Sequence, residues 1–149
     1  FCVGEVSEAV KQLLRTTKES LYKGINECYP GRRLGDIGNA VQSHCEAAGY
    51  GVVREFVGHG VGKEMHEDPQ VPNYGKRGNG RTLKNGLCIA IEPMIVMGSP
   101  EIALKPDRWG IVTRDGQVAA HFEHSIAIHH GKYDILSSFE EIEKIVGQI

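Results

Sequence analysis

The chain has 149 residues, 40% hydrophobic content and a formal net charge of −2. This length suits one domain with its own core, so we expect residues 1–149 to be a single-domain fragment. Lysine and arginine are scattered without forming a basic stripe, which argues against direct nucleic-acid recognition. No apolar run reaches the roughly 18 residues that a membrane-spanning helix needs, so we predict a soluble protein with no membrane partner.

The four cysteines are widely spaced and form no Cys-x-x-Cys pair. Disulfide frameworks of small secreted domains and thiolate metal sites both need closer groups of cysteines. We therefore expect reduced thiols and a cytoplasmic protein. The first residue is Phe1 instead of an initiator Met, and we expect an upstream segment in the parent protein.

Two helices are predicted in the first third of the chain. Apolar residues recur on one helical face from Val6 to about Glu27, and Pro30-Gly31 ends that pattern. A second helix is predicted from about Leu34 to Ala48, with Gly49 as its C-terminal cap.

Short apolar runs after these helices predict strands. They are Val52–Val57, Leu87–Ile91, Met94–Met97, Ile111–Thr113 and Val118–His129. Asp115-Gly116 separates the last two runs and predicts a hairpin, because Asp-Gly tolerates the positive φ of a tight turn. Ser138 precedes Glu141 by three residues, the spacing of a capping box, which predicts a short terminal helix. The predicted fold class is α+β, with two main helices and an antiparallel sheet.

Two histidines lie in a glycine-rich segment after the first predicted strand. His59 stands between Gly58 and Gly60, where small neighbours let the backbone bend and leave the imidazole facing a cleft. His66 follows seven residues later. Histidine is a common ligand of divalent metals, but it is also common in loops without a function. From the residues alone, both readings stay open for this pair.

Two glutamates lie in or next to predicted strands. Glu92 ends an apolar strand and precedes Pro93, which restricts Glu92 to extended conformations. Glu123 lies inside the longest predicted strand and shares a face with His121 and Ser125. A buried carboxylate needs a cation or hydrogen-bond donors, whereas one at a strand end or sheet edge faces water. The sequence leaves both arrangements open for each glutamate.

Five short motifs occur together in one order along the chain. They are Gly-His-Gly-Val-Gly around His59, Met-His-Glu-Asp-Pro around His66, Ile-Glu-Pro-Met around Glu92, Asp-Arg-Trp ending at Trp109 and Phe-Glu-His-Ser around Glu123. In this order and spacing, the chain resembles the C-terminal part of the catalytic domain of the methionine aminopeptidases. The short segment between the two glutamates resembles type I members, because type II members carry a helical insertion there. The resemblance implies the pita-bread (creatinase/aminopeptidase) fold, here mainly its C-terminal half.

The resemblance also implies the chemistry of the site. This family removes the initiator methionine from nascent proteins, using two divalent metal ions (Mn, Fe, Co or Zn) and a metal-activated water. His59, Glu92 and Glu123 would be metal ligands, and Glu92 would also transfer protons as a catalytic residue. His66 would be catalytic, because it would donate a hydrogen bond to the peptide and to the tetrahedral intermediate. The N-termini of nascent peptides would be the partners, with the ribosome as a further candidate.

The resemblance extends to substrate binding and includes two departures. Met65 and Trp109 would line the pocket for the substrate methionine, next to the peptide-binding His66. Most family members have phenylalanine at the position of Met65. Two aspartate ligands and a further histidine precede this region in the family, and four aspartates of this chain lie in no matching motif: Asp36, Asp68, Asp107 and Asp115. We therefore expect this chain alone to bind metal weakly and to turn over poorly.

Two other classes share the pita-bread fold and stay open as alternatives. Proline-specific aminopeptidases carry the same metal ligands, but they generally have a large N-terminal domain and other histidine motifs. Non-catalytic binding proteins of this fold tend to lose metal ligands, whereas His59, Glu92 and Glu123 are all present here. The sequence therefore favours the methionine aminopeptidase.

Overall fold

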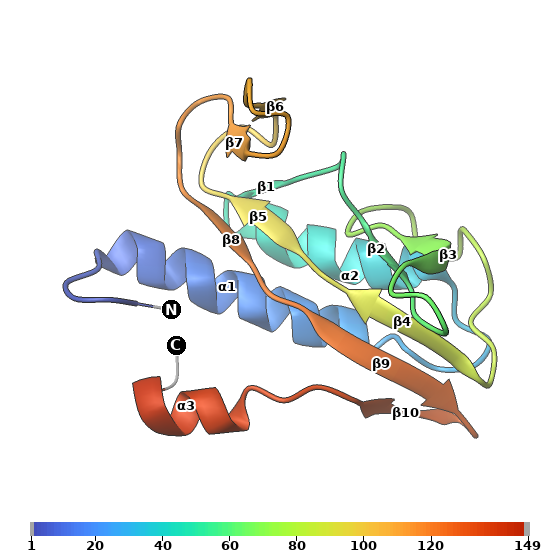
Figure 1. The fold of residues 1–149 in the computed structure, drawn as a ribbon. Coiled ribbons are helices and arrows are strands. Elements are labelled where there is room, and N and C mark those ends of the chain that lie inside the picture. Colours follow the sequence, from blue (N-terminus) through green and yellow to red (C-terminus); the bar gives the residue numbers. More distant parts are fainter. Residues whose placement is uncertain (1, 148–149) are drawn as a thin grey trace.

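The computed structural model describes residues 2–147, and its helices are α1 (Glu8–Ile25), α2 (Leu34–Ala47) and α3 (Glu140–Val146) (Figure 1). The first two lie within a few residues of their predicted bounds, because an apolar face and end signals occur together in the sequence. Ser7 caps α1 by accepting a hydrogen bond from the Val10 N–H at 3.4 Å. Gly49 follows α2 with a φ of +83°, which a C-terminal cap requires.

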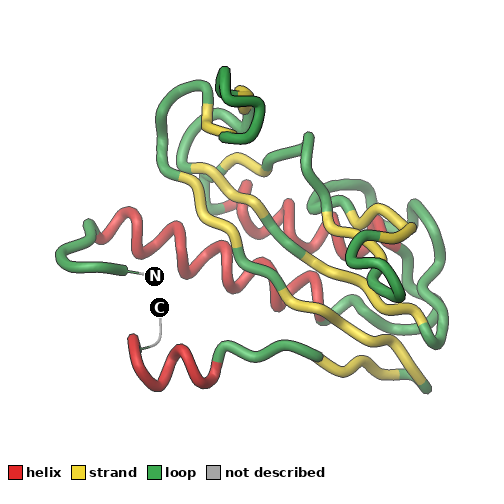
Figure 2. Tube along the Cα trace, in the orientation of Figure 1, coloured by secondary structure: helices red, strands yellow, loops and turns green. Residues whose placement is uncertain are grey.

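Within residues 2–147 the strands, drawn yellow in Figure 2, form three antiparallel sheets. Their bounds are β1 Gly51–Val52, β2 Gly58–Gly60, β3 Glu67–Val71, β4 Leu87–Ile91, β5 Met94–Val96, β6 Ile102–Leu104, β7 Ile111–Thr113, β8 Ala119–His121, β9 His124–His129 and β10 Lys132–Ile135. The five-stranded sheet has the order β10-β9-β4-β2-β3, and the three-stranded sheet has the order β1-β5-β8. The remaining strands, β6 and β7, form a separate hairpin.

The core lies between these sheets and the two long helices, which cover one face (Figure 1). A cluster of large aliphatic side chains joins both helices to the five-stranded sheet: Leu21, Ile25, Ile37, Ile89, Ile91, Ile126 and Ile128. A second cluster joins them to the three-stranded sheet: Leu13, Val41, Val52 and Ile95. Each such side chain stabilises the fold by about 1.5–3 kcal/mol when it leaves water, so the core fixes the register of the strands.

One predicted strand is much shorter than expected, and another is divided. The predicted strand Val52–Val57 is reduced to β1, because its pairing with β5 ends at Val52. The predicted strand Val118–His129 is divided into β8 and β9 by Phe122 and Glu123. Apolar composition favours extended backbone, but it does not show where a partner strand ends.

The predicted hairpin at Asp115-Gly116 is wrong in its pairing. A turn is present, with Gly116 at a φ of +72° and the Asp115 carboxylate accepting from the Gln117 N–H at 3.0 Å. The flanking strands, however, have other partners, since β7 pairs with β6 and β8 pairs with β5. A tight turn sets only the local reversal of the chain, whereas partners depend on which faces can be buried.

The predicted terminal helix is confirmed as α3, but its capping box is wrong. The Ser138 hydroxyl accepts from the Glu140 N–H at 3.1 Å, and the helix itself begins at Glu140. The Glu141 carboxylate instead pairs with the Lys144 ammonium at 2.6 Å. The helix begins one residue too far along the chain, with Phe139 rather than Ser138 at its N-cap, so Glu141 is not at the position that a capping box requires.

All four cysteines are free, as predicted. Burial raises the pKa of Cys28 to about 12 and that of Cys45 to about 11, which makes both thiols poor nucleophiles and poor metal ligands. None of the helices within residues 2–147 is long and apolar enough to cross a membrane.

Candidate metal centre

Two stretches of chain, β4 to β5 and β8 to β9, each connect the five-stranded sheet to the three-stranded sheet, and the two connections lie side by side. Only Glu92 and Pro93 separate β4 from β5, and only Phe122 and Glu123 separate β8 from β9. Across this interruption the Phe122 N–H still donates to the Pro93 carbonyl at 3.4 Å. We call these four residues the strand break.

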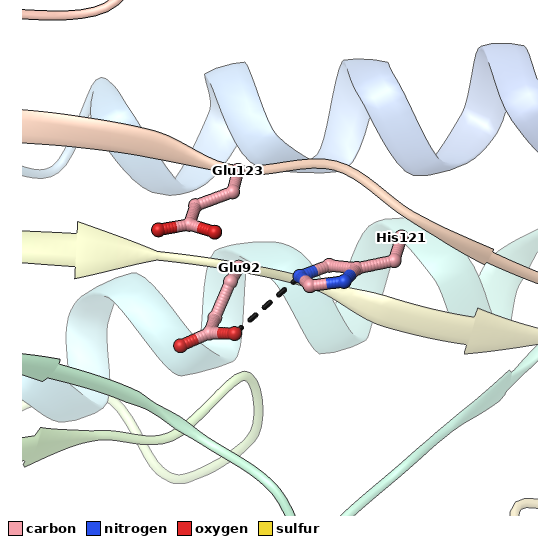
Figure 3. Close-up of side chains that lie close together, drawn as sticks. All are labelled: Glu92, His121 and Glu123. Atoms are coloured by element: carbon pink, nitrogen blue, oxygen red, sulfur yellow. Dashed lines mark ion pairs between the residues drawn. The ribbon is translucent and has the colours of Figure 1, made fainter. Parts of the chain in front are cut away.

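Glu92 lies opposite Glu123 within the strand break. Pairing of β4 with β9 runs up to Ile91, pairing of β5 with β8 resumes at Met94, and the register is the same on both sides. This register places the two carboxylates on neighbouring strands, as Figure 3 shows. Like charges that lie opposite each other destabilise a sheet unless a cation or hydrogen-bond donors lie between them.

Side-chain alternation points both glutamates to the face that the helices leave open. Ile91 faces α1, since a Cβ on Gly24 would lie 3.6 Å from its Cγ2, so the following Glu92 points the other way. His124 also faces α1, where its Nε2 lies 3.2 Å from the Tyr22 hydroxyl, so the preceding Glu123 points the other way. The strand break therefore presents its carboxylates to the open face.

Two imidazoles face the two oxygens of Glu92. His59 Nε2, from β2, lies 3.6 Å from Oε1. His121 Nε2, at the end of β8, lies 3.4 Å from Oε2, and Figure 3 shows this second contact. The Glu92 side chain is only 14% exposed, so its charge has lost most of its contact with water. Such a carboxylate needs positive charge close by.

The donor atoms at the strand break fit a divalent metal ion. Glu92, His121 and Glu123 each offer one ligand atom, and these atoms lie within 4.8 Å of one another. Imidazole nitrogen and carboxylate oxygen together suit Mn, Fe, Co and Zn. An ion between the two carboxylates would also balance the like charges that the strand register brings together.

The glycines beside His59 are required by close strand packing rather than by the predicted bend. A Cβ on Gly58 would lie 2.3 Å from the Ala90 carbonyl oxygen, and one on Gly60 would lie 2.2 Å from the Asp68 carbonyl oxygen. Both distances are too short for any real Cβ contact. Glycine therefore lets β2 fit tightly between β4 and β3.

A backbone hydrogen bond sets the tautomer of His59. Its Nδ1 lies 2.8 Å from the Gly60 carbonyl oxygen. A carbonyl only accepts, so Nδ1 carries the proton, and in the neutral ring Nε2 has a free lone pair. Ligating histidines commonly have this arrangement, with one nitrogen fixed by a hydrogen bond and the other toward the metal.

His66 lies beside His59 in the structure. The two ring centroids are 4.2 Å apart and the rings are tilted by 53°. His66 is exposed and has no hydrogen bond to another residue in the described range 2–147. Met65 is 75% exposed next to it. The fold encloses neither side chain, so both are accessible to a ligand.

The structure does not bring Trp109 to the other predicted site residues. It lies between β6 and β7, on a hairpin beyond the end of β5 that is farther from Glu92 (Figure 1). Its side chain is 89% exposed.

An apolar pocket of about 280 Å³ opens beside the strand break. Its apolar walls come from α1, the strand break, and the segment that forms α3: Leu14, Phe122, Phe139, Ile142 and Val146. Neither Met65 nor Trp109 lines this pocket. The pocket therefore lies apart from the predicted substrate-binding pair.

His124 belongs to the fold rather than to the metal centre, although it follows Glu123 in the chain. Its Nδ1 lies 2.8 Å from the Ser137 hydroxyl oxygen, and its ring stacks on Phe139 with centroids 4.2 Å apart. Burial lowers the pKa of His124, and the charge of Lys18 adds to the effect. The neutral ring is thus favoured.

His121 is the residue near the metal centre that the sequence did not predict as a ligand. The alternation of the strand put it on the same face as Glu123, and this was the only signal available. Its contact with Glu92 depends on the pairing of β5 with β8, which no local pattern reveals.

The chain matches the profile of metallopeptidase family M24 over residues 1–130. This match covers most of the chain, which therefore belongs to that family. The fold and the donor atoms of the strand break agree with a metallopeptidase.

Two curated relatives are named methionine aminopeptidases. Methionine aminopeptidase 1 of Bacillus subtilis is 50% identical over 137 residues, which cover 92% of this chain and 55% of the relative. The methionine aminopeptidase of Clostridium acetobutylicum is 47% identical over 140 residues, which cover 94% of this chain and 56% of the relative. The chain thus spans about half the length of these relatives.

Solved structures confirm the α+β pita-bread fold class. The methionine aminopeptidase of Thermotoga maritima matches with a TM-score of 0.89 at 48% identity, over 91% of this chain and 55% of that one. An X-Pro aminopeptidase from the same organism matches with a TM-score of 0.67 at 18% identity, over 91% of this chain and 33% of that one. The second likeness shows the fold alone.

Proposed function

We propose that this chain supplies catalytic residues of a methionine aminopeptidase, a metal-dependent hydrolase that removes the N-terminal methionine from peptides. The observation that carries the proposal is the opposed pair Glu92 and Glu123, flanked by imidazoles on the open face. Family membership and the names of the relatives support the same activity. Because the chain spans about half of those relatives, the activity of the whole protein is part of the proposal.

His59, Glu92 and Glu123 are the proposed metal ligands. When bound, two divalent ions would supply Lewis acidity to the scissile carbonyl and to an attacking water. Glu92 is also the proposed proton carrier, because its carboxylate lies beside two imidazoles, 3.6 Å from His59 and 3.4 Å from His121, and a carboxylate there can accept and return a proton. Mn, Fe, Co and Zn are all compatible with these ligands.

His66 is the proposed hydrogen-bond donor to the substrate. Its exposed ring lies 4.2 Å from that of His59, which favours contact with a peptide carbonyl held beside the proposed ligand. Such a hydrogen bond strengthens as negative charge develops on the carbonyl oxygen in the transition state. Met65 and Trp109 are proposed to contact the methionine side chain of the substrate, Met65 from the loop before β3 and Trp109 from the β6–β7 hairpin.

We propose that the chain alone binds metal weakly and turns over slowly. No aspartate of the described residues belongs to the cluster at the strand break. Several have other partners: Asp36 caps α2, Asp107 and Asp115 close turns, and Asp134 pairs with His129. Three ligands are few for two ions, because each ion prefers four or more.

The same proposal extends to partners and location. The N-termini of nascent peptides are the proposed substrates, the ribosome is a candidate partner, and the cytoplasm is the proposed compartment. The four free cysteines agree with that compartment, since thiols stay reduced there.

The test is release of methionine from a Met-Ala-Ser peptide by the purified chain with added Mn²⁺ or Co²⁺. We expect slow release that disappears in Glu123→Ala and persists in His129→Ala, a histidine that pairs with Asp134. Equal release by Glu123→Ala would mean that a contaminating peptidase is responsible.

A second peptide separates the proposal from the proline-specific alternative. An X-Pro peptide offered under the same conditions should be cleaved more slowly than Met-Ala-Ser. Faster cleavage of the X-Pro peptide would contradict the methionine specificity and favour the alternative.

A further inference from the structure

We propose that His121 is an additional metal ligand, so that the chain offers four ligands rather than three. This inference rests on the proposed function, because it concerns the same metal centre. His121 is 48% exposed at the end of β8, and Glu92 is its only ion-pair partner among the described residues. An exposed imidazole can coordinate an ion without a change in the fold.

The distance between His121 and Glu92 favours a shared ion over a direct contact. Nε2 and Oε2 are 3.4 Å apart, longer than the usual 2.7–3.2 Å of an N–H···O hydrogen bond. Two ligand atoms that each lie about 2.0–2.1 Å from one tetrahedral ion would be separated by roughly 3.3–3.4 Å. The pair is therefore already spaced as two ligands of one ion.

Each carboxylate oxygen of Glu92 has one imidazole nitrogen at a distance of this kind. His59 Nε2 lies 3.6 Å from Oε1, close to the 3.4 Å between His121 Nε2 and Oε2. The two histidines come from β2 and β8 and contact opposite oxygens of one carboxylate. Glu92 thus belongs to two ligand sets, one with His59 and one with His121.

Glu123 completes the set that contains His121. Ligand atoms of Glu92, His121 and Glu123 lie within 4.8 Å of one another, and Figure 3 shows the three side chains around one space. His121 precedes Glu123 by two residues, so the two side chains lie on the same face of the strand. The pairing of His121 with Met94 then brings the imidazole close to Glu92 on the neighbouring strand. An imidazole here adds a nitrogen ligand where the described residues offer no aspartate.

The first test measures Co²⁺ binding to the full chain by calorimetry. We expect His121→Ala to weaken binding by at least about tenfold, as the loss of a group at a metal centre commonly does. His129→Ala is the matched control, because it removes a histidine that pairs with Asp134 instead, and it should bind Co²⁺ as the wild type does. Circular dichroism of each variant checks that the fold is retained. Equal affinity of His121→Ala and the wild type would overturn the proposal.

The second test counts ligating histidines directly. In the Co²⁺-loaded chain, each ligating imidazole gives a strongly shifted, exchangeable ring N–H signal in the proton NMR spectrum. The wild type should show one such signal more than His121→Ala, and His129→Ala should keep the wild-type number. The same number in His121→Ala and the wild type would overturn the proposal.

Glu123→Ala separates this inference from the proposed function. If Glu123→Ala weakens Co²⁺ binding and His121→Ala does not, the metal centre stands and only the role of His121 is wrong. If neither variant changes the affinity, the metal centre itself is wrong, and the proposed function fails with it.

Discussion

The two faces of the segment 121–124 differ in whether their side chains have packing partners within the fold. On the helix side, Phe122 and His124 pack against Phe139, with centroid distances of 5.7 Å and 4.2 Å. On the open side, His121 and Glu123 are exposed. Side chains that alternate along one short segment thus have two roles: those on one face stabilise the fold, and those on the other face are available to bind a ligand.

This difference predicts opposite effects of substitution on the two faces. A satisfied side chain stabilises the folded state, so its loss lowers the free energy of unfolding. Opposed like charges destabilise the folded state without a cation, so removal of one should leave stability unchanged or higher while it removes ligand binding. Stability and metal affinity can therefore be measured separately on each face.

The largest expected effect is on the open face, in Glu92→Gln. Because both imidazoles contact this carboxylate, we expect Mn²⁺ affinity to fall by about 100-fold. Without metal, loss of the repulsion with Glu123 should raise the free energy of unfolding by about 0–1 kcal/mol. Calorimetry with Mn²⁺ and urea unfolding with a chelator measure the two quantities. If Glu92→Gln lowers the free energy of unfolding and keeps the Mn²⁺ affinity, then Glu92 stabilises the fold and is not a metal ligand.

The next effect is on the helix side, in Phe139→Ala. This half-buried ring contacts both Phe122 and His124, so we expect a loss of about 2–3 kcal/mol in the free energy of unfolding. Mn²⁺ affinity should stay within about twofold of the wild type, because the ring offers no ligand atom and stacks on Phe122 and His124 rather than on a proposed ligand. Urea unfolding and calorimetry check both, and a large loss of affinity would show that the two faces are coupled.

Local signals in the sequence predicted much of the helix side. The apolar face of α1 and the capping glycine Gly49 after α2 each act over a few residues, so the sequence shows them directly. The apolar run of β4 is likewise visible as a strand. His59 and Glu92 were singled out because glycine and proline mark their backbone positions.

The open face depends on pairings between distant residues, which the sequence did not show. The strand break exists because β4 and β9 share a register with β5 and β8, and this register alone opposes Glu92 and Glu123. His121 was not predicted as a ligand for the same reason, since its partner lies on the neighbouring strand. The hairpin predicted at Asp115-Gly116 was wrong because this turn reverses the chain, but the strands on its two sides pair with other strands.

Asp36 differs from Glu92 and Glu123, because it is a buried carboxylate with hydrogen-bond donors at both oxygens. Its two oxygens accept from the Arg33 and Gly78 N–H groups at 2.8 Å and 2.9 Å. Burial alone would raise the pKa of Asp36, but these bonds and the charges of Arg32 and Arg77 outweigh it, so the pKa is lowered. Asp36→Asn puts an NH₂ group against one N–H, and we expect a loss of about 1.5–2 kcal/mol at pH 7.

This loss should depend on pH with a definite sign. A carboxyl whose pKa is lowered by folding stabilises the folded state fully above its unfolded pKa, which is about 4 for aspartate, and the effect disappears as pH falls through the folded pKa. The difference in unfolding free energy between the wild type and Asp36→Asn should therefore be largest near neutral pH and shrink in acid. A difference that stays constant from pH 7 to pH 3 would contradict this role of the Asp36 charge.

The smallest expected effect is that of Trp109→Ala on stability. The side chain is 89% exposed on the β6–β7 hairpin and packs against neither core cluster, so the free energy of unfolding should change by less than about 0.5 kcal/mol. Because Trp109 is the only tryptophan, its fluorescence also reports on the proposed substrate contact. A methionine-containing peptide that packs against the indole should shift the emission to shorter wavelength, and an alanine-for-methionine control peptide should not. Equal spectra with both peptides would mean that Trp109 does not contact the substrate methionine in this chain. The strand break and its neighbouring histidines would then be the remaining candidates for substrate contact on the open face.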